Sequence, residues 1–401
     1  MSVVGIVCEY NPFHKGHLLH IQNTLQAFGN DSTVVCVMSG DYVQRGEPAL
    51  YSKFARAEAA CLCGADLVIE LPLPWCLASA EGFARGSVGL LCALGAEYLS
   101  FGSEAGNTES LEQIAEALLD SLLTERTKEL MAREASLSFA RARQIALEEK
   151  LGAAASIIEA PNNILAVEYI KAIHQHKLQI RPFTIQRIGS AHDSEGGEEV
   201  KSASELRKLI RRGENVEGYI PPEALGVFRR EHEHGRVLDA DRFEAALMSR
   251  LRLLDRDRFN LLPDAGDGLG NKLWKAAAQE ACYDDVLEAA KSKRYAMSRM
   301  RRMCMCAALG VTAQMSEGIP AYARVLAAND KGFSVLKDCA KRDSIKILAK
   351  PAAAKDLSAN DRMIFALGAA AHDLYTLSYW AQCERKGGDD WRSSPFIVKN
   401  D

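Results

Sequence analysis

The chain has 401 residues, of which 48% are hydrophobic and 25% charged, and its formal net charge is −4. This length allows two or three domains, and the composition argues against long disorder. No run of about 18 apolar residues occurs, and the N-terminus has no signal-peptide pattern. We therefore expect a cytoplasmic protein, and an acidic chain of this kind would bind nucleic acid only through local basic patches.

Cysteine usage points to the same compartment. The eleven cysteines are scattered, several lie in apolar runs such as TVVCVM, and none forms a CxxC pair. The pairs Cys61/Cys63 and Cys304/Cys306 have CxC spacing without paired histidines, which does not fit a zinc site. We therefore predict buried free thiols in a reducing compartment and no metal site.

Short β-rich runs divide the first hundred residues at regular intervals. They are SVVGIVC (2–8), STVVCVM (32–38), ADLVIEL (65–71) and AEYLSFG (96–102), which begin 30, 33 and 31 residues apart. Helices are expected between them at 17–28, 51–63 and 79–94. The spacing is typical of strand–helix–strand units, and near-continuous apolar strands indicate a sheet covered on both faces. The sequence therefore predicts an α/β, Rossmann-like domain with a doubly wound parallel sheet.

Beyond residue 102, helices are predicted at 107–150, 161–171 and 202–212. A fifth strand is expected at 178–188, followed by a polar, glycine-containing loop at 189–199. After the double proline of GYIPPEAL the pattern is almost wholly helical, with DSIKILAK as a weak strand signal. We therefore divide the chain into a sheet domain at 1–225 and an all-helical C-terminal domain at 226–401.

Unusual loops follow the first four predicted strands. They are EYNPFHKGH, SGDYVQRGEPA, PLPW and FGSE. The carboxyl ends of parallel strands meet at one edge of an open sheet, which is where ligands bind. Turn formation alone does not require so many polar and glycine-rich stretches at one edge. The sequence therefore predicts a ligand site there.

The first of these loops contains His14, Gly16 and His17. Gly16 allows a ligand to approach the backbone closely, and His17 stands where a helix begins. Two imidazoles at a helix N-terminus can donate hydrogen bonds to phosphate and stabilise charge that develops when an α-phosphate is attacked. A zinc site would need further ligands, and a plain turn with two surface histidines is the other alternative. We interpret the loop as a nucleotide site because it lies in a strand–turn–helix context.

Two motifs carry a resemblance to a known superfamily. PFHKGH resembles the HxGH element of the nucleotidyltransferases, relatives of class I aminoacyl-tRNA synthetases, and KSASELR (201–207) resembles their second element. A helix N-terminus with Lys201 and Arg207 would hold the β- and γ-phosphates. SxSxxR alone is a weak signal, since many helices begin with serine, but it gains weight beside FHKGH. The resemblance implies catalytic roles for His14, His17, Ser202 and Arg207.

A closer resemblance extends along the sheet domain. CEYNPFHKGH, MSGDYVQRGEPA, FGSE, PNNILAVEYIKA and QRIGSAHD together resemble one bacterial family, tRNA(Met) cytidine acetate ligase. This implies activation of acetate by ATP as acetyl-adenylate, then acetylation of the wobble cytidine of elongator tRNA(Met), with Mg²⁺ accompanying the triphosphate. It also implies ATP contacts from Val7, Cys8, Glu9, Tyr10, Asn11, Pro12, Phe13, His14, Lys15, Gly16, His17, Leu18, Leu19, His20, Gly102, Asn162, Arg187 and Ile188.

Two further groups are predicted to hold the other substrates. Gln44 and Arg45 lie beside glycines in GDYVQRG, which suits a small carboxylate or a phosphate. In KSKRYAMSRMRR (291–302), six of twelve residues are basic and none is acidic, with Tyr295 among them, which suits tRNA phosphates and base stacking. A solvated helix face is the alternative for this strip. The basic residues predicted to contact tRNA are Lys291, Lys293, Arg294, Arg299, Arg301 and Arg302.

Other functions stay open on the sequence alone. The same fold could transfer a nucleotidyl group from a nucleoside triphosphate to a small phosphate-bearing acceptor. It could also be a non-catalytic RNA-binding protein, which the presence of both histidines and Arg207 disfavours. Lys53 and Arg56, about one turn apart on a predicted helix, would either neutralise pyrophosphate or lie on a solvated helix face.

Overall fold

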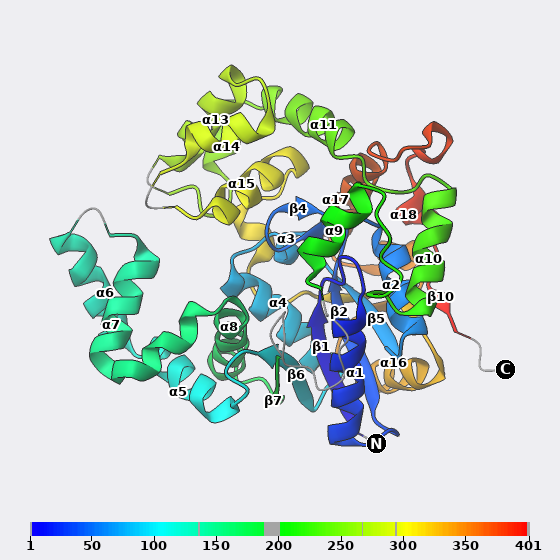
Figure 1. Ribbon diagram of the computed structural model, residues 1–401, viewed down its shortest axis with the longest axis horizontal. Helices are drawn as coiled ribbons and strands as arrows, with labels where there is room; N and C mark the ends of the chain where they lie inside the picture. Colours follow the sequence, from blue (N-terminus) through cyan, green and yellow to red (C-terminus); the bar gives the residue numbers. More distant parts are fainter. Residues whose placement is uncertain (1, 135–136, 188–200, 267, 293–294, 399–401) are drawn as a thin grey trace.

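The computed structural model describes residues 2–134, 137–187, 201–266, 268–292 and 295–398. A central sheet is surrounded by helices, with one helical lobe above it and a helical arm at one side (Figure 1). The predicted contacts Ile188, Lys293 and Arg294, and the loop predicted at 189–199, lie outside the described residues.

The predicted parallel strands form the centre of the sheet. They are β1 (Val3–Cys8), β2 (Thr33–Ser39), β5 (Leu67–Leu71), β6 (Tyr98–Ser103) and β7 (Arg181–Gln186). They pair in parallel in the order β5-β2-β1-β6-β7. The order reverses between β1 and β6, and ligands bind at such a switch point in open α/β sheets. The predicted doubly wound α/β domain is confirmed.

The helices of the first half also follow the prediction, except that the expected loop PLPW forms most of a short helix. Their bounds are α1 (Lys15–Phe28), α2 (Lys53–Leu62), α3 (Leu73–Cys76), α4 (Ala80–Ala93), α5 (Thr108–Leu119), α6 (Ser121–Arg133), α7 (Phe139–Leu151), α8 (Pro161–Gln175) and α9 (Ala203–Arg211). Helices α5, α6 and α7 resolve the predicted helical stretch 107–150 and form the arm at the left of Figure 1. A 3₁₀ segment, η1 (Gly152–Glu159), leads from the arm into α8.

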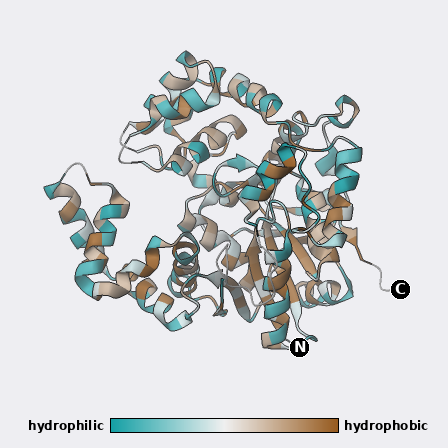
Figure 2. Cartoon of the chain, viewed as in Figure 1, coloured by the Kyte–Doolittle hydropathy of each residue, from teal (hydrophilic) through white to brown (hydrophobic). Residues whose placement is uncertain are grey.

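Each face of the sheet has its own core. Successive residues of a strand point to opposite faces. In β2, Val34, Cys36 and Met38 pack in the core that includes residues of α1 and α2, whereas Val35 and Val37 pack in the core that includes residues of α4 and α8. Figure 2 shows apolar strands between helices with hydrophilic outer faces. The near-continuous apolar strands therefore reflect a sheet buried on both sides.

The expectation of an all-helical C-terminal part needs one correction. β8 (Tyr322–Ala328), β9 (Lys346–Leu348) and β10 (Phe396–Ile397) join the sheet, and β8 pairs antiparallel with β5. The β8 sequence, YARVLAA, is fully buried and rich in alanine, so it carries little β-propensity or alternation. Burial against β5 decides its conformation, and the C-terminal half therefore completes the edge of the sheet.

The rest of the C-terminal half is helical. Its helices are α10 (Pro222–Glu233), α11 (Ala240–Arg252), α12 (Arg256–Asn260), α13 (Leu269–Gln279), α14 (Tyr283–Ala290), α15 (Met297–Leu309), α16 (Asp330–Arg342), α17 (Ala359–Thr376) and α18 (Asp389–Arg392), with 3₁₀ segments η2 (Ala313–Ser316), η3 (Pro351–Asp356) and η4 (Gln382–Glu384). No helix among the described residues is long and apolar enough to cross a membrane. Helices α11, α13, α14 and α15 form the upper lobe in Figure 1.

The cysteines are free, and most of them are buried. Burial raises the pKa of Cys304 and of Cys306 to about 12, which keeps both thiols protonated at neutral pH. The prediction of buried free thiols is confirmed for these and for most of the others.

Candidate active site

Two histidines cap the helix that follows β1. His14 is the N-cap residue of α1, and its Nδ1 accepts a hydrogen bond from the Gly16 N–H at 3.0 Å. The Nδ1 of His17 accepts from the His14 N–H at 3.3 Å, and the two ring centroids lie 3.8 Å apart. A neutral imidazole that accepts through Nδ1 carries its proton on Nε2. Each ring therefore offers an Nε2–H donor to a ligand.

Burial keeps these rings neutral. Burial, together with the charge of nearby Arg187, lowers the pKa of His14 and of His20 to about 4. Burial, then His14 and then Arg187, hold the pKa of His17 well below its usual range. The imidazoles are therefore uncharged at pH 7, and they would stabilise phosphate as hydrogen-bond donors rather than as cations.

Gly102 and Arg187 lie beside these histidines at the ends of β6 and β7. The Arg187 N–H donates to the carbonyl of Ser103 at 2.8 Å. A Cβ on Gly102 would lie 3.0 Å from Arg187 Cγ, so the arginine side chain lies over the glycine backbone. Because its charge lowers the pKa of all three histidines, Arg187 lies near the N-terminal part of α1. The structure thus gathers these residues around the β1/β6 switch point.

Asn162 joins α8 to the loop that follows β6. Its Nδ2 donates to Oε1 of Glu104 at 2.6 Å, and the Asn163 N–H donates to Oε2 of the same carboxylate at 3.0 Å. The N-cap residue of α8 is Ala160, without a side-chain cap, so Asn162 is not the cap. Its amide is therefore held at the edge of the sheet where the strands end.

The second motif lies directly against the first. Ser202 is the N-cap residue of α9, and Glu205 completes a capping box with it. Arg207 Nη1 donates to the carbonyl of Asn11 at 2.7 Å, across 196 positions of the chain. Burial lowers the pKa of Arg207, and the negative charges of Glu47 and Glu9 oppose this effect. The HxGH loop and the serine-capped, arginine-bearing helix therefore share one site.

A two-stranded hairpin borders this site. It consists of β3 (Tyr42–Val43) and β4 (Glu47–Pro48), which carry Gln44 and Arg45 between them. The Gln44 N–H donates to Oε1 of Glu9 at 2.9 Å, and Arg45 is exposed. Because the hairpin follows β2 and Glu9 follows β1, both lie on the β1/β2 side of the first loop.

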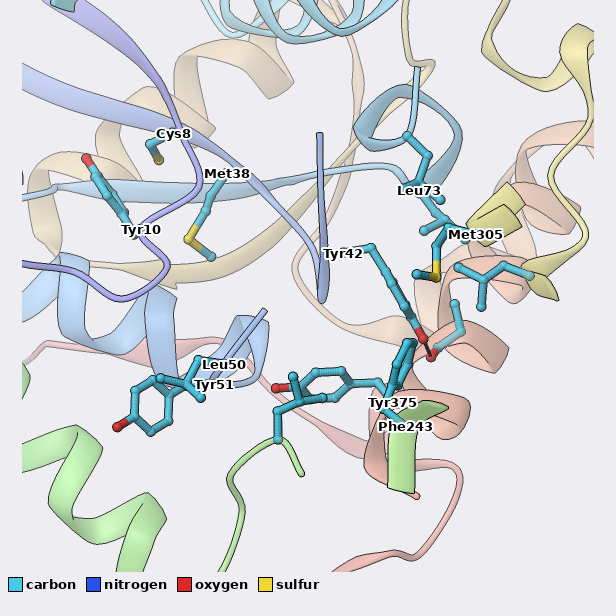
Figure 3. Packing of buried hydrophobic residues seen from close by; sticks show 14 of the residues in the cluster. Cys8, Tyr10, Met38, Tyr42, Leu50, Tyr51, Leu73, Phe243, Met305 and Tyr375 are labelled. Carbon is cyan, nitrogen blue, oxygen red and sulfur yellow. Dashed lines mark hydrogen bonds between the residues drawn. The ribbon is translucent and has the colours of Figure 1, made fainter. Parts of the chain in front are cut away.

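The hairpin also contacts the helical lobe. Glu47 pairs with Arg301 of α15 at 2.5 Å and lies 4.0 Å from Arg207 of α9. Figure 3 shows the Tyr42 ring beside Tyr375 of α17 and Phe243 of α11. The hairpin therefore joins helix α9, which carries Ser202 and Arg207, to the lobe that contains the basic strip.

Gly46 makes this junction possible, and we expect Gly46→Ala to disrupt it. Gly46 has φ +76°, and a Cβ there would lie 2.6 Å from the Arg301 carbonyl carbon and 2.4 Å from the Arg302 nitrogen. Strained backbone alone costs about 1–3 kcal/mol, so thermal melting should show lower stability. Gly226→Ala is the control, since nothing lies within 4 Å of its added Cβ. Equal melting of both variants would contradict this close packing.

The described part of the basic strip is not uniformly exposed. Lys291 is exposed and pairs with Glu288 at 3.0 Å, and Arg299 Nη2 donates to the carbonyl of Asp264 at 2.7 Å. Arg302 is 9% exposed and lies 3.6 Å from the Asp264 carboxylate. Burial therefore argues against direct contact between Arg302 and tRNA, and its charge serves the packing of α15.

Neither expectation for Lys53 and Arg56 is correct. Lys53 is 1% exposed, and its Nζ lies 2.8 Å from Glu70 and 2.8 Å from Asp390. Arg56 is fully buried and donates to the carbonyls of Glu9, Ser39, Gly40 and Tyr51. Arg56 therefore holds together the loops that follow β1 and β2, and Lys53 joins α2 to β5 and α18. Sequence reasoning missed this because a charged pair on a helix gives no sign of burial.

These features define a nucleotide-binding enzyme of the nucleotidyltransferase class. The imidazole donors lie at the N-terminus of α1, and Arg207 of α9 contacts the loop that precedes them. Both groups lie at the edge of the sheet where the parallel strands end, which is where ligands bind in α/β folds. Among the described residues, no group of three or more His, Cys, Asp and Glu side chains is placed to hold a metal ion.

Comparisons with known proteins agree with this class. The family model for HIGH Nucleotidyl Transferase matches residues 1–390. The chain is 37% identical over 388 residues to the tRNA(Met) cytidine acetate ligase of Thermoanaerobacter sp. (strain X514), covering 94% of this chain and 96% of the relative. It is 34% identical over 421 residues to that of Acetivibrio thermocellus, covering 99% and 100%.

A solved structure is similar over the full length of both chains. It is the crystal structure of Thermotoga maritima TmcAL bound with alpha-thio ATP, with a TM-score of 0.92, 30% identity and 100% coverage of each chain. The chain therefore belongs to the tRNA(Met) cytidine acetate ligase family.

Proposed function

We propose that this chain activates acetate with ATP and acetylates the wobble cytidine of elongator tRNA(Met) in the cytoplasm, releasing AMP and pyrophosphate. The observation that carries the proposal is the contact between the two motifs, in which Arg207 donates to the Asn11 carbonyl of the loop that ends in His14. The names of the relatives and the ATP analogue bound to Thermotoga maritima TmcAL support it.

The first step joins acetate to AMP. An acetate oxygen attacks the α-phosphorus, the P–O bond to pyrophosphate breaks, and pyrophosphate leaves with the electron pair. The Nε2–H groups of His14 and His17 would donate to phosphate oxygens, and Arg187 and Arg207 would neutralise phosphate charge. Mg²⁺ would enter with the triphosphate and add positive charge there. Positioning and charge neutralisation suffice, so no protein nucleophile is needed.

Two measurements test this function. ATP–pyrophosphate exchange should depend on added acetate, because only acetate forms the adenylate reversibly. Mass spectrometry of elongator tRNA(Met), treated with the protein, ATP and labelled acetate, should place one labelled acetyl group on the wobble cytidine. Exchange that ignores acetate, together with transfer of AMP or CMP to a phosphate-bearing acceptor, would instead establish a nucleotidyltransferase.

We expect Lys291→Gln to weaken tRNA binding several-fold. Lys291 is an exposed basic residue at the end of α14, and loss of one phosphate contact should make the salt dependence of binding shallower by about 0.7–0.9 in log–log slope. Lys341→Gln on α16 is the matched control, because it is also an exposed lysine paired with an acid three residues before it. An unchanged affinity and slope in Lys291→Gln would remove this residue from the tRNA surface.

A further inference from the structure

Glu9 is a carboxylate placed at the loop that ends β1, on the side of the hairpin. Its side chain is half-buried, and its Oε1 accepts the Gln44 N–H at 2.9 Å. Its backbone carbonyl accepts a hydrogen bond from the buried Arg56 side chain, which holds this residue in place. No described residue donates a hydrogen bond to its second oxygen, Oε2. Within the described part of the chain, Glu9 therefore has one carboxylate oxygen that accepts no hydrogen bond.

Other carboxylates around the site are engaged by protein groups. Glu47 is paired with Arg301, Glu104 holds the N-terminus of α8, and Glu205 caps α9. Asp41 accepts from the Lys53 backbone and contacts His372, and it is buried. Glu9 differs from these acids because half of its carboxylate has no described partner.

The negative charge of Glu9 makes its side chain a poor partner for the phosphates of ATP. A carboxylate repels phosphate oxygens, so the Glu9 side chain suits the acceptor side of the reaction and not a phosphate contact. Arg207 acts on Glu9 electrostatically and also donates to the Asn11 carbonyl, two residues further along the same loop. Arg207 therefore acts on both Glu9 and the first loop, and the exposed Arg45 also acts on Glu9 electrostatically.

We propose that Glu9 is the catalytic base of acetyl transfer, and that its Oε2 accepts a proton from the exocyclic amine of the cytidine. This inference rests on the proposed function. The amine nitrogen attacks the acetyl carbonyl carbon and forms the N–C bond, and the C–O bond to phosphate breaks so that AMP leaves with the electron pair. One amine proton passes to Glu9 Oε2 and then to water. A carboxylate is also the natural acceptor for the N4–H donor of cytosine, so the same contact favours cytidine over uridine.

The groups around Glu9 determine its pKa and so the pH dependence of acetyl transfer. Burial raises its pKa, while Arg56, Arg207 and Arg45 oppose that rise. The groups that face it from α8 and α3 are Tyr169 and Cys76, and burial raises the pKa of each, that of Cys76 to about 12. The arginines stay charged and these two groups stay neutral near pH 7. Since a base acts as the carboxylate, acetyl transfer should fall as pH falls through the raised pKa of Glu9.

The test separates the two half-reactions in Glu9→Gln, which retains an oxygen to accept the Gln44 N–H. Acetyl transfer from supplied acetyl-adenylate to tRNA(Met), measured in a single turnover, should fall by about 10²–10³-fold. The rate of transfer should also no longer decrease as the pH is lowered. Acetate-dependent ATP–pyrophosphate exchange, measured without tRNA, should fall less than transfer by a factor of about ten or more, because Glu9 also lies in the segment predicted to contact ATP. Glu81→Gln, an exposed carboxylate on α4, is the control and should alter neither reaction.

A second variant distinguishes catalysis from support of the hairpin. Glu9→Asp keeps a base, so it should retain the pH dependence with a lower rate, whereas a structural role would tolerate Gln better than Asp. Normal transfer by Glu9→Gln, or equal losses of transfer and exchange, would overturn the proposal. Failure of the unmodified protein to catalyse acetate-dependent exchange would instead overturn the proposed function, so the two failures are distinguishable.

Discussion

Replacing His17 by asparagine should lower acetate-dependent ATP–pyrophosphate exchange by about 10²–10³-fold, the cost of losing one donor to a developing charge. The amide oxygen of asparagine can still accept the His14 N–H that the His17 Nδ1 accepts at 3.3 Å, so the cap of α1 survives. What disappears is the Nε2–H. The variant should therefore melt near the temperature of the unmodified protein and bind tRNA with nearly the same affinity.

His17→Ala removes both the Nε2–H donor and the acceptor that completes the capping box with His14, so it should lose exchange and also some stability, about 1 kcal/mol. His176→Asn, at the exposed end of α8, is the control. Because burial and Arg187 hold the pKa of His14 at about 4, both rings are neutral well below pH 6. Exchange should therefore show no histidine-dependent loss as pH rises from 6 to 8. Normal exchange in His17→Asn would remove this ring from the chemistry.

The sequence predicted the parts of the fold that have local signals. Strands β1, β2, β5 and β6 are apolar runs bounded by polar loops, and the capped helix α9 begins at the expected serine. FHKGH and SASELR could be placed together because both occupy the ends of strands or starts of helices in an α/β domain. Their direct contact through Arg207 and Asn11 follows from this topology.

Features that depend on long-range burial had no such signal. β8 is an alanine-rich run whose strand conformation comes from pairing with β5, more than 250 positions earlier in the chain. The partners of Glu47 lie on two helices that are remote in sequence, Arg207 and Arg301. Periodicity reports the face that an element buries but not the group it meets there. Pairings of this kind become visible only in three dimensions.

Lys53 is the clearest case of a buried pairing without a local sequence signal. We expect Lys53→Met to destabilise the protein by about 3–5 kcal/mol. Its Nζ lies 2.8 Å from Glu70, 2.8 Å from Asp390 and 3.9 Å from Asp41, and all four side chains are buried. Methionine has similar volume, so the loss comes from uncompensated carboxylates and not from a cavity. Urea unfolding should show a lower midpoint, whereas Lys346→Met, an exposed paired lysine, should change stability little.

The buried cluster around Lys53 is balanced in charge, which allows a test of how its ion pairs stabilise the protein. Burial would lower the pKa of His372, but the charge and hydrogen bond of Asp41 outweigh it and raise that pKa. With Arg324, which contacts Glu70 and Asp390, the cluster holds as many cations as carboxylates when His372 is protonated.

Lys53→Met leaves one carboxylate in excess, and Lys53→Met/Asp390→Leu restores the balance. The double variant should therefore be more stable than additive single losses by about 0.5–3 kcal/mol. Strict additivity in this cycle would mean that Lys53 and Asp390 do not stabilise each other across the junction of α2 and α18. Because Asp41 immediately precedes the hairpin and accepts from the Lys53 N–H, the same cluster holds the hairpin that borders the active site.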